Sequence, residues 1–152
     1  DLRIAEAQAR FSQPEVDMGL TTGIGGCSRL ARLAGRATAA EMVLTGAAVP
    51  AQRLYELGAI NRVVPAGESL SAALELAAAL AQKSPVATAG IKRILAFNDT
   101  APLDAALRHE QEVFQSVVVS AQARAGMEQV QARYDQARAA PVLRGNEKAP
   151  KT

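Results

Sequence analysis

Residues 11–26 read Phe11-Ser12-Gln13-Pro14-Glu15-Val16-Asp17-Met18-Gly19-Leu20-Thr21-Thr22-Gly23-Ile24-Gly25-Gly26. Pro14 disfavours a helical conformation at Gln13, so Glu15 follows a stiff turn. Four glycines in the last eight residues give the backbone unusual freedom and allow close approach. A carboxylate beside free backbone N–H groups can transfer protons while the amides orient a water. Glu15 is therefore a candidate acid/base, the alternative being a surface carboxylate that caps a helix or pairs with an arginine.

The residues around this segment predict short strands followed mainly by helices. Residues 2–5 and 9–11 are β-like, and residues 60–64 alternate and are β-branched before Pro65 ends them. Helices are expected over 27–33, closed by Gly35, over 39–45, with Thr38 as N-cap and Gly46 as the stop, and over 51–57. Further helices are expected over 69–82, from Ser84-Pro85 to 97, over 102–119, and from the Ser120 cap to 139.

The long predicted helix over 69–82 carries an apolar face. Leu70, Leu74, Leu76 and Leu80 recur near helical spacing, so we expect them to be buried. Residues 141–152 are rich in Pro, Gly, Asn and Lys, which is typical of a solvated tail.

Composition excludes several classes of protein. The 152 residues are 49% hydrophobic and alanine-rich but only 3% aromatic, which argues against an aromatic β-sandwich or a base-stacking platform. The 17 Lys and Arg are interspersed with 15 Asp and Glu, so no nucleic-acid partner is expected. One cysteine allows no internal disulfide, and no apolar run is long enough to span a membrane. We expect a cytoplasmic protein without membrane contact. The strand at the very start suggests that a larger domain has been cut.

Other reactive residues carry weaker signals. His109, the only histidine, lies in a charged helical stretch, and without ligand-spaced partners it predicts a solvent-facing position and no metal site. Cys27 follows two glycines at a helix start, where a thiol can be activated, but a small buried residue is the favoured interpretation. Asp17 could be a second carboxylate near Glu15. The glycine turn lacks the Lys-Ser/Thr of a phosphate loop, so a nucleotide site is disfavoured.

Taken together, the motifs resemble the enoyl-CoA hydratase/isomerase (crotonase) superfamily. The resemblance extends from Asp1 to about Tyr134, and the order and spacing of its motifs are more specific than any one of them. They are Phe11-Ser12-Gln13-Pro14-Glu15, Gly19, Gly23-Ile24-Gly25-Gly26 with Arg29-Leu30, residues 40–46, Ala51, residues 57–65, Ser84-Pro85, Lys92 and Ala125-Gly126-Met127.

The resemblance implies an acyl-CoA thioester as substrate, with no cofactor beyond the coenzyme A that it carries. Glu15 would be one of two glutamates that hold and ionise the added water, and the Gly23 N–H would bind the same water. The glycine turn becomes a wall of the acyl pocket. The implied substrate-binding residues are Pro14, Gly19, Thr22 in place of the family's usual proline, Asp17 in place of an aliphatic residue, and Arg133 near the CoA adenine.

The resemblance also implies that the chain corresponds to the later part of the family domain. The first catalytic glutamate and both oxyanion amides would lie upstream of Asp1. The expected α/β architecture is a crotonase-like spiral-core fragment over residues 1–65, a helical trimerisation and CoA-side region over 66–140, and a tail over 141–152. A homotrimer or a dimer of trimers is expected.

The implied reaction is reversible hydration of a trans-2-enoyl-CoA. Three alternatives remain: an enoyl-CoA isomerase that uses Glu15 alone, a non-catalytic crotonase-like oligomerising subunit, and a helical domain with accidental motifs.

Overall fold

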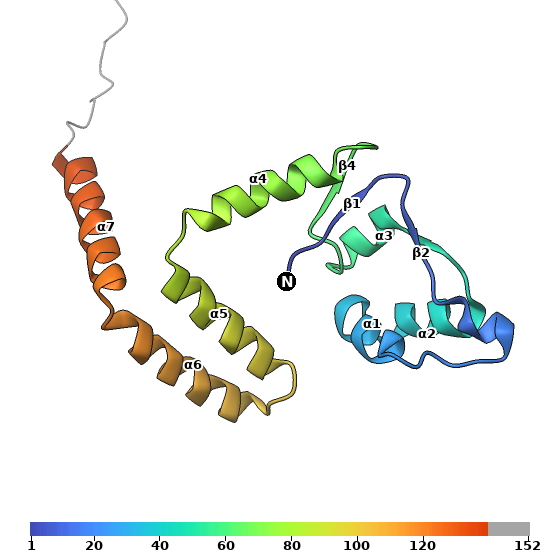
Figure 1. The fold of residues 1–152 in the computed structure, drawn as a ribbon. Helices are drawn as coiled ribbons and strands as arrows, with labels where there is room; N and C mark the ends of the chain where they lie inside the picture. Colours follow the sequence, from blue (N-terminus) through green and yellow to red (C-terminus); the bar gives the residue numbers. More distant parts are fainter. Residues whose placement is uncertain (140–152) are drawn as a thin grey trace, which may run out of the picture. The chain divides into compact units, whose positions relative to one another are not determined.

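The computed structural model describes residues 1–139, so the predicted tail at 141–152 lies outside the described residues. The chain divides into two compact units, the first spanning Asp1–Leu80 and the second beginning at Ala81 (Figure 1). Each unit is described below by itself.

Unit 1 contains two small sheets. In one, β1 (Ile4–Glu6) pairs in parallel with β4 (Arg62–Val64), with Ile4 opposite Arg62. In the other, β2 (Arg10–Phe11) pairs antiparallel with β3 (Val49–Pro50). The strands predicted over 2–5, 9–11 and 60–64 are thus confirmed, with shifted ends, whereas β3 was not predicted because two residues show no alternation.

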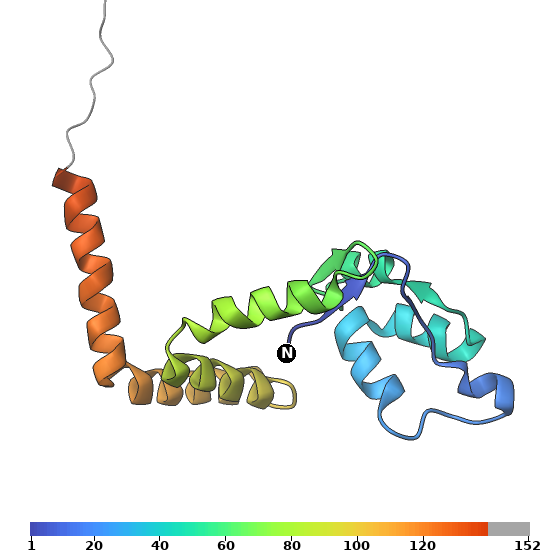
Figure 2. The same ribbon diagram turned by 45° about the horizontal axis from the view of Figure 1, so that its top comes forward.

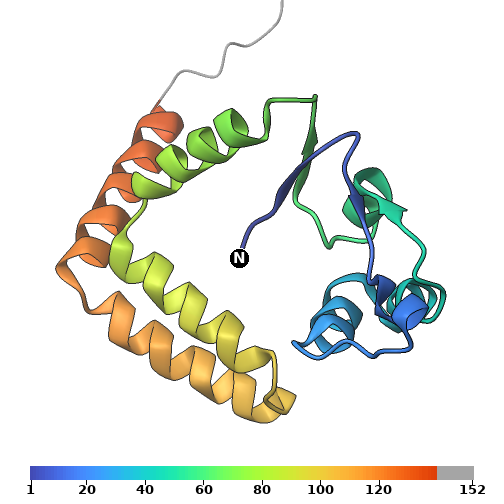
Figure 3. The same ribbon diagram turned by 45° about the vertical axis from the view of Figure 1, so that its right-hand side comes forward.

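Three helices pack with these strands. They are α1 (Gly26–Ala34), α2 (Arg36–Thr45) and α3 (Ala51–Glu56), and Figures 1 and 3 both show α1 beside α2. The core joins β1, the helices and the turn before β4 through a buried cluster of Ala5, Ala34, Met42, Ala51, Leu54, Ala59 and Ile60. Small alanines at these positions let the helices and strands approach one another closely.

The predicted helix cap at Thr38 is wrong. The helix α2 begins at Arg36, and its N-cap is Gly35, whose φ of 82° reverses the chain directly after α1. One glycine thus ends one helix and begins the next, which leaves Thr38 inside α2. The predicted stop at Gly46 is confirmed, since Gly46 adopts the left-handed conformation at φ 65°.

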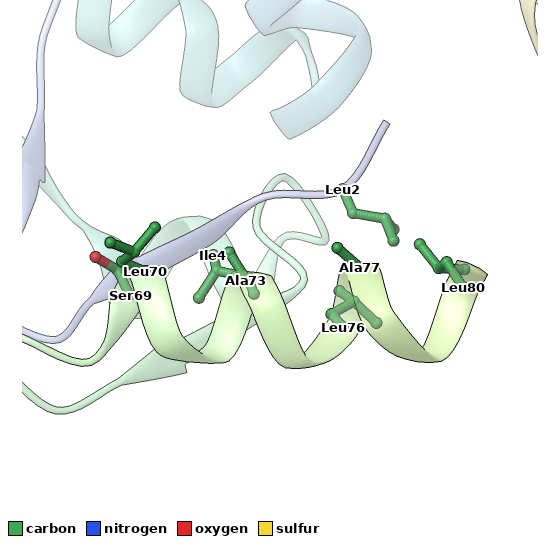
Figure 4. A pocket seen from close by; sticks show the side chains of 8 residues that line it. All are labelled: Leu2, Ile4, Ser69, Leu70, Ala73, Leu76, Ala77 and Leu80. Carbon is green, nitrogen blue, oxygen red and sulfur yellow. The ribbon is translucent and has the colours of Figure 1, made fainter. Parts of the chain in front are cut away.

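The helix α4 (Ser69–Ala81) does not bury its leucines. Leu70 is 69% exposed and Leu74 is 61% exposed, so the predicted buried face is wrong for the described residues. A groove of about 440 Å³ lies between α4 and the first strand (Figure 4). Its walls are mostly apolar, since Leu2 and Ile4 lie opposite the leucines and alanines of α4.

All the regular elements in the described part of unit 2 are helices. The unit contains α5 (Pro85–Asn98), α6 (Leu103–Val118) and α7 (Ala121–Ala139), close to the predicted bounds. Figures 2 and 3 show α5 and α6 lying side by side. The predicted caps are confirmed, since Ser84 Oγ accepts the Ala87 N–H at 3.3 Å and Ser120 Oγ accepts the Ala123 N–H at 3.1 Å.

His109 is less exposed than its charged neighbours suggested. Its ring centroid lies 4.3 Å from that of Phe97, and its side chain is 23% exposed. The solvent-facing position predicted for it is therefore wrong, because α6 turns this side chain toward the end of α5. Within residues 1–139, no helix combines the length and the apolar character needed to cross a membrane.

Candidate functional site

Glu15 lies in a short 3-10 helix, η1 (Pro14–Met18). Pro14 stands at its first position, where the fixed φ of proline suits a helix and its missing N–H costs nothing. Gly19 ends the turn in the left-handed conformation at φ 70°, and the Leu20 N–H donates to the Glu15 carbonyl at 3.0 Å. Both ends of η1 are thereby fixed, which limits the positions that the Glu15 carboxylate can take.

The Glu15 side chain borders a hollow of about 430 Å³. The hollow lies between the start of η1 with the residues before it, the glycine turn and α1. Its lining residues are Ser12, Gln13, Pro14, Glu15, Ile24, Gly25, Gly26, Arg29, Leu30 and Leu33. Glu15 Oε2 is buried and has no hydrogen-bond partner among the described residues. Buried polar atoms are nearly always paired, so this oxygen is suited to receive a hydrogen bond or a proton from a bound molecule.

The glycine turn allows close approach at Gly25 and Gly26. Gly25 has a φ of 88°, a conformation that residues with a Cβ rarely adopt. A Cβ on Gly26 would collide with Gln13 Oε1 and lie 3.1 Å from the Thr22 Cβ. Gly23, in contrast, is exposed, and a Cβ built there would meet nothing within 4 Å. The Cα side of Gly23 is therefore open to solvent.

Thr22 ties the turn to the start of α1. Its Oγ1 accepts the Cys27 N–H at 3.1 Å and donates to the Cys27 Sγ at 3.0 Å. This hydroxyl satisfies one of the unpaired N–H groups at the helix N-terminus. Sequence reasoning missed this cap because Thr22 lies four residues before the helix. The expectation that Cys27 is buried is wrong, since its thiol is exposed on the first turn of α1.

The structure brings together some of the predicted site residues and not others. Pro14 and Glu15 line the same hollow, and Gly23 directly precedes three of its lining residues, Ile24, Gly25 and Gly26. Asp17 is not among the lining residues. Its carboxylate lies against Gly46 at the end of α2, where a Cβ would be 2.9 Å from Asp17 Oδ2. Arg133 is exposed on α7, which belongs to unit 2, whereas Glu15 belongs to unit 1.

Arg29 is a site residue to which sequence reasoning gave no role. It lines the hollow with Glu15, and its Nη2 donates to the Ile24 carbonyl. Its guanidinium covers Gly25, where a Cβ would lie 3.0 Å from Cζ. Within residues 1–139, no cluster of three or more His, Cys, Asp or Glu side chains could hold a metal ion.

Comparison with known proteins gives a family. The model of the family described as enoyl-CoA hydratase/isomerase matches residues 1–137. The short-chain-enoyl-CoA hydratase of Clostridium acetobutylicum is 37% identical over 114 residues, which are 75% of this chain and 44% of that protein. The 2,3-dehydroadipyl-CoA hydratase of Escherichia coli is 36% identical over 114 residues, or 75% of this chain and 45% of that protein.

Solved structures agree in fold. The crystal structure of enoyl-CoA hydratase from Mycobacterium tuberculosis superposes with a TM-score of 0.82 at 33% identity, over 88% of this chain and 53% of that one. The chain spans about half the length of these three relatives. The chain belongs to the enoyl-CoA hydratase/isomerase family and has the crotonase fold.

Proposed function

We propose that the protein catalyses the reversible hydration of trans-2-enoyl-CoA to 3-hydroxyacyl-CoA, with Glu15 as general acid/base. The observation that carries this proposal is the buried, unpaired Glu15 Oε2 in a hollow walled by the glycine turn. The relatives named enoyl-CoA hydratases support the reaction class.

The chemistry of hydration fits a carboxylate in this position. A hydroxyl group from water forms a bond with the β-carbon while the Cα=Cβ double bond opens, and a proton reaches the α-carbon. Glu15 moves that proton between the water and the α-carbon, and the Gly23 N–H holds the water. The Gly23 N–H has no backbone hydrogen-bond partner among the described residues, which is compatible with a water at that amide. Residues outside this chain would stabilise the thioester oxygen and supply the second glutamate.

The remaining substrate contacts belong to the same proposal. Pro14, Gly19, Thr22 and Asp17 shape the acyl pocket in this proposal, through η1 and the glycine turn. The exposed guanidinium of Arg133 binds near the CoA adenine. Asp17 contributes indirectly, because its carboxylate lies against Gly46 and not in the hollow. The substrate carries its own coenzyme A, and no further cofactor enters the proposed reaction.

The proposed assembly is a cytoplasmic homotrimer or a dimer of trimers. Exposed apolar side chains on α5 and α6 support such an assembly, since contacts between subunits would cover Ile91, Leu95, Leu107 and Phe114. In this proposal residues 1–65 belong to the catalytic core and residues 66–140 to the trimerisation and CoA-side region.

The test replaces Glu15 with glutamine in the whole protein. We expect Glu15→Gln to lower kcat for hydration of crotonyl-CoA by about 10²–10⁴-fold, because the amide cannot carry the proton. Binding of a saturated acyl-CoA should stay near that of the wild type. Glu41→Gln, on the exposed side of α2, is the matched control and should keep full activity. A Glu15→Gln variant that keeps more than about half of the activity would contradict the assignment.

Double-bond isomerisation is the second candidate function. It is supported by the placement of Glu15 in the hollow. An isomerase needs a single group to move a proton between two carbons. Hydration of a 2-enoyl-CoA removes the absorbance of the conjugated thioester, whereas isomerisation of a 3-enoyl-CoA creates it. The direction of the absorbance change therefore separates the two functions.

A further inference from the structure

The glycine turn has little backbone support of its own. Among the described residues, no backbone–backbone hydrogen bond involves an N–H or carbonyl group of residues 21–24. The last such bond before the turn is that of Leu20 to Glu15, and the next is that of the Arg29 N–H to the Gly25 carbonyl. The position of the Gly23 amide therefore depends on side chains.

Two side chains hold the turn from opposite ends. Thr22 binds the Cys27 N–H, as described above. The side chain of Arg29 extends from α1 toward the turn and donates to the carbonyl of Ile24, the residue after Gly23. Its guanidinium lies over Gly25 so closely that a Cβ there would be 3.0–3.1 Å from three guanidinium atoms. The missing side chain at Gly25 thus makes room for Arg29.

Stability of α1 does not explain this arrangement. The side chain of Arg29 places a positive charge beside the N-terminus of the helix, where the helix dipole is also positive. Arg32, one turn later, is exposed and lies near the C-terminus, where a positive charge is favourable. The unfavourable location of the Arg29 charge indicates that this side chain is placed for the turn.

We propose that Arg29 is a positioning residue, which fixes the Gly23 amide relative to Glu15 by holding the Ile24 carbonyl. This inference rests on the proposed function. Arg29 does not touch the reacting atoms in it. Its contribution is to keep the water-binding amide at the right distance from the carboxylate, because small displacements of catalytic groups are costly in rate.

The test compares Arg29→Met with Arg32→Met in the whole protein. Methionine keeps the apolar stem but cannot donate to the Ile24 carbonyl. We expect Arg29→Met to lower kcat by about 10- to 100-fold while KM for the enoyl-CoA changes by less than about threefold. Arg32→Met should match the wild type. Arg29→Lys should recover at least about threefold over Arg29→Met, because its ammonium can still donate to the same carbonyl.

Three outcomes would overturn the inference: a kcat of Arg29→Met equal to that of Arg32→Met, a loss confined to KM, or no recovery in Arg29→Lys. Failure of the proposed function is recognised separately, because then the wild type neither hydrates nor isomerises an enoyl-CoA. In that case crystal structures of Arg29→Met and Arg32→Met still decide the point. A displaced glycine turn in Arg29→Met alone supports the positioning role, and an unchanged turn rejects it.

Discussion

The core of unit 1 and the segment that carries the site are built in different ways. Every buried apolar residue of unit 1 lies at Ala5 or between Ala34 and Ile60, and none of residues 6–33 is buried. The core is held by close packing around Met42, Ala51 and Leu54. The site segment is held by a 3-10 turn, left-handed glycines and the side chains of Thr22 and Arg29.

This contrast separates stability from chemistry. Burial of apolar side chains is the main favourable contribution to folding. The core therefore holds the two ends of the site segment in place. The segment itself gains little from burial and leaves Glu15 Oε2 unpaired. Substitutions in the core should therefore change the free energy of unfolding, whereas substitutions in the segment should change the rate of catalysis more than stability.

The largest expected effect on stability is that of Met42→Ala. Met42 is 1% exposed, and its truncation leaves a cavity, so the free energy of unfolding should fall by about 2–5 kcal/mol. Chemical denaturation measures the loss. The control is Leu44→Ala on the same helix, where the side chain is 72% exposed and the change should be small. An equal loss in the two variants would contradict the distinction between core and surface. A lower kcat in folded Met42→Ala would contradict the separation of stability from catalysis.

An intermediate effect is expected from Thr22→Val. Valine keeps the shape of the side chain but removes the hydroxyl that accepts the Cys27 N–H, so stability should fall by about 1 kcal/mol. Because the turn also loses one of its two side-chain supports, kcat should fall as well, even under conditions in which the variant is fully folded. Thermal unfolding and steady-state kinetics measure the two effects. Thr22→Ser keeps the hydroxyl and should behave like the wild type in unfolding, and a Thr22→Ser variant as unstable as Thr22→Val would contradict the capping role.

The smallest expected effect is a pH dependence at the edge of the core. The Gly67 N–H, the Ser69 hydroxyl and the Gln8 amide donate hydrogen bonds that hold the pKa of the Glu6 carboxyl below its ordinary value. The contribution of these hydrogen bonds to the free energy of unfolding is therefore complete above the unfolded pKa of about 4.3. It is lost as the pH falls through the lower pKa of the folded state. Chemical denaturation should show a higher free energy of unfolding for the wild type than for Glu6→Gln at neutral pH, and this difference should disappear in acid. A difference that grows in acid would contradict the assignment.

Local signals in the sequence predicted much of the fold. The serines and prolines at Ser84-Pro85, Pro102 and Ser120 predicted where α5, α6 and α7 begin, because these signals act within a few residues. The parallel pairing of β1 with β4 could not be predicted in the same way, since it joins residues 58 positions apart. The α4 leucines were misassigned because helical periodicity shows which face is apolar but not whether another element covers it.

The candidate site was predicted only in part. The Gln13-Pro14-Glu15 turn and the nearby glycines are local patterns that marked Glu15 as a candidate, whereas the role of Gly23 came from the family resemblance. The supporting residues could not, because the contact of Arg29 with the Ile24 carbonyl depends on a side-chain conformation. The contact of Asp17 with Gly46 depends on the packing of η1 against α2. Neither interaction leaves a spacing pattern in the sequence.

The most direct test of the central claim, that Glu15 carries the proton to and from the α-carbon, is exchange of that proton with solvent. The measurement follows deuterium entering the α-position of a 3-hydroxyacyl-CoA in D2O, by NMR, with the whole protein. We expect exchange with the wild type and Glu41→Gln, and exchange slower by at least about 10²-fold with Glu15→Gln. Exchange at the wild-type rate in Glu15→Gln would show that another group moves the proton and would contradict the account.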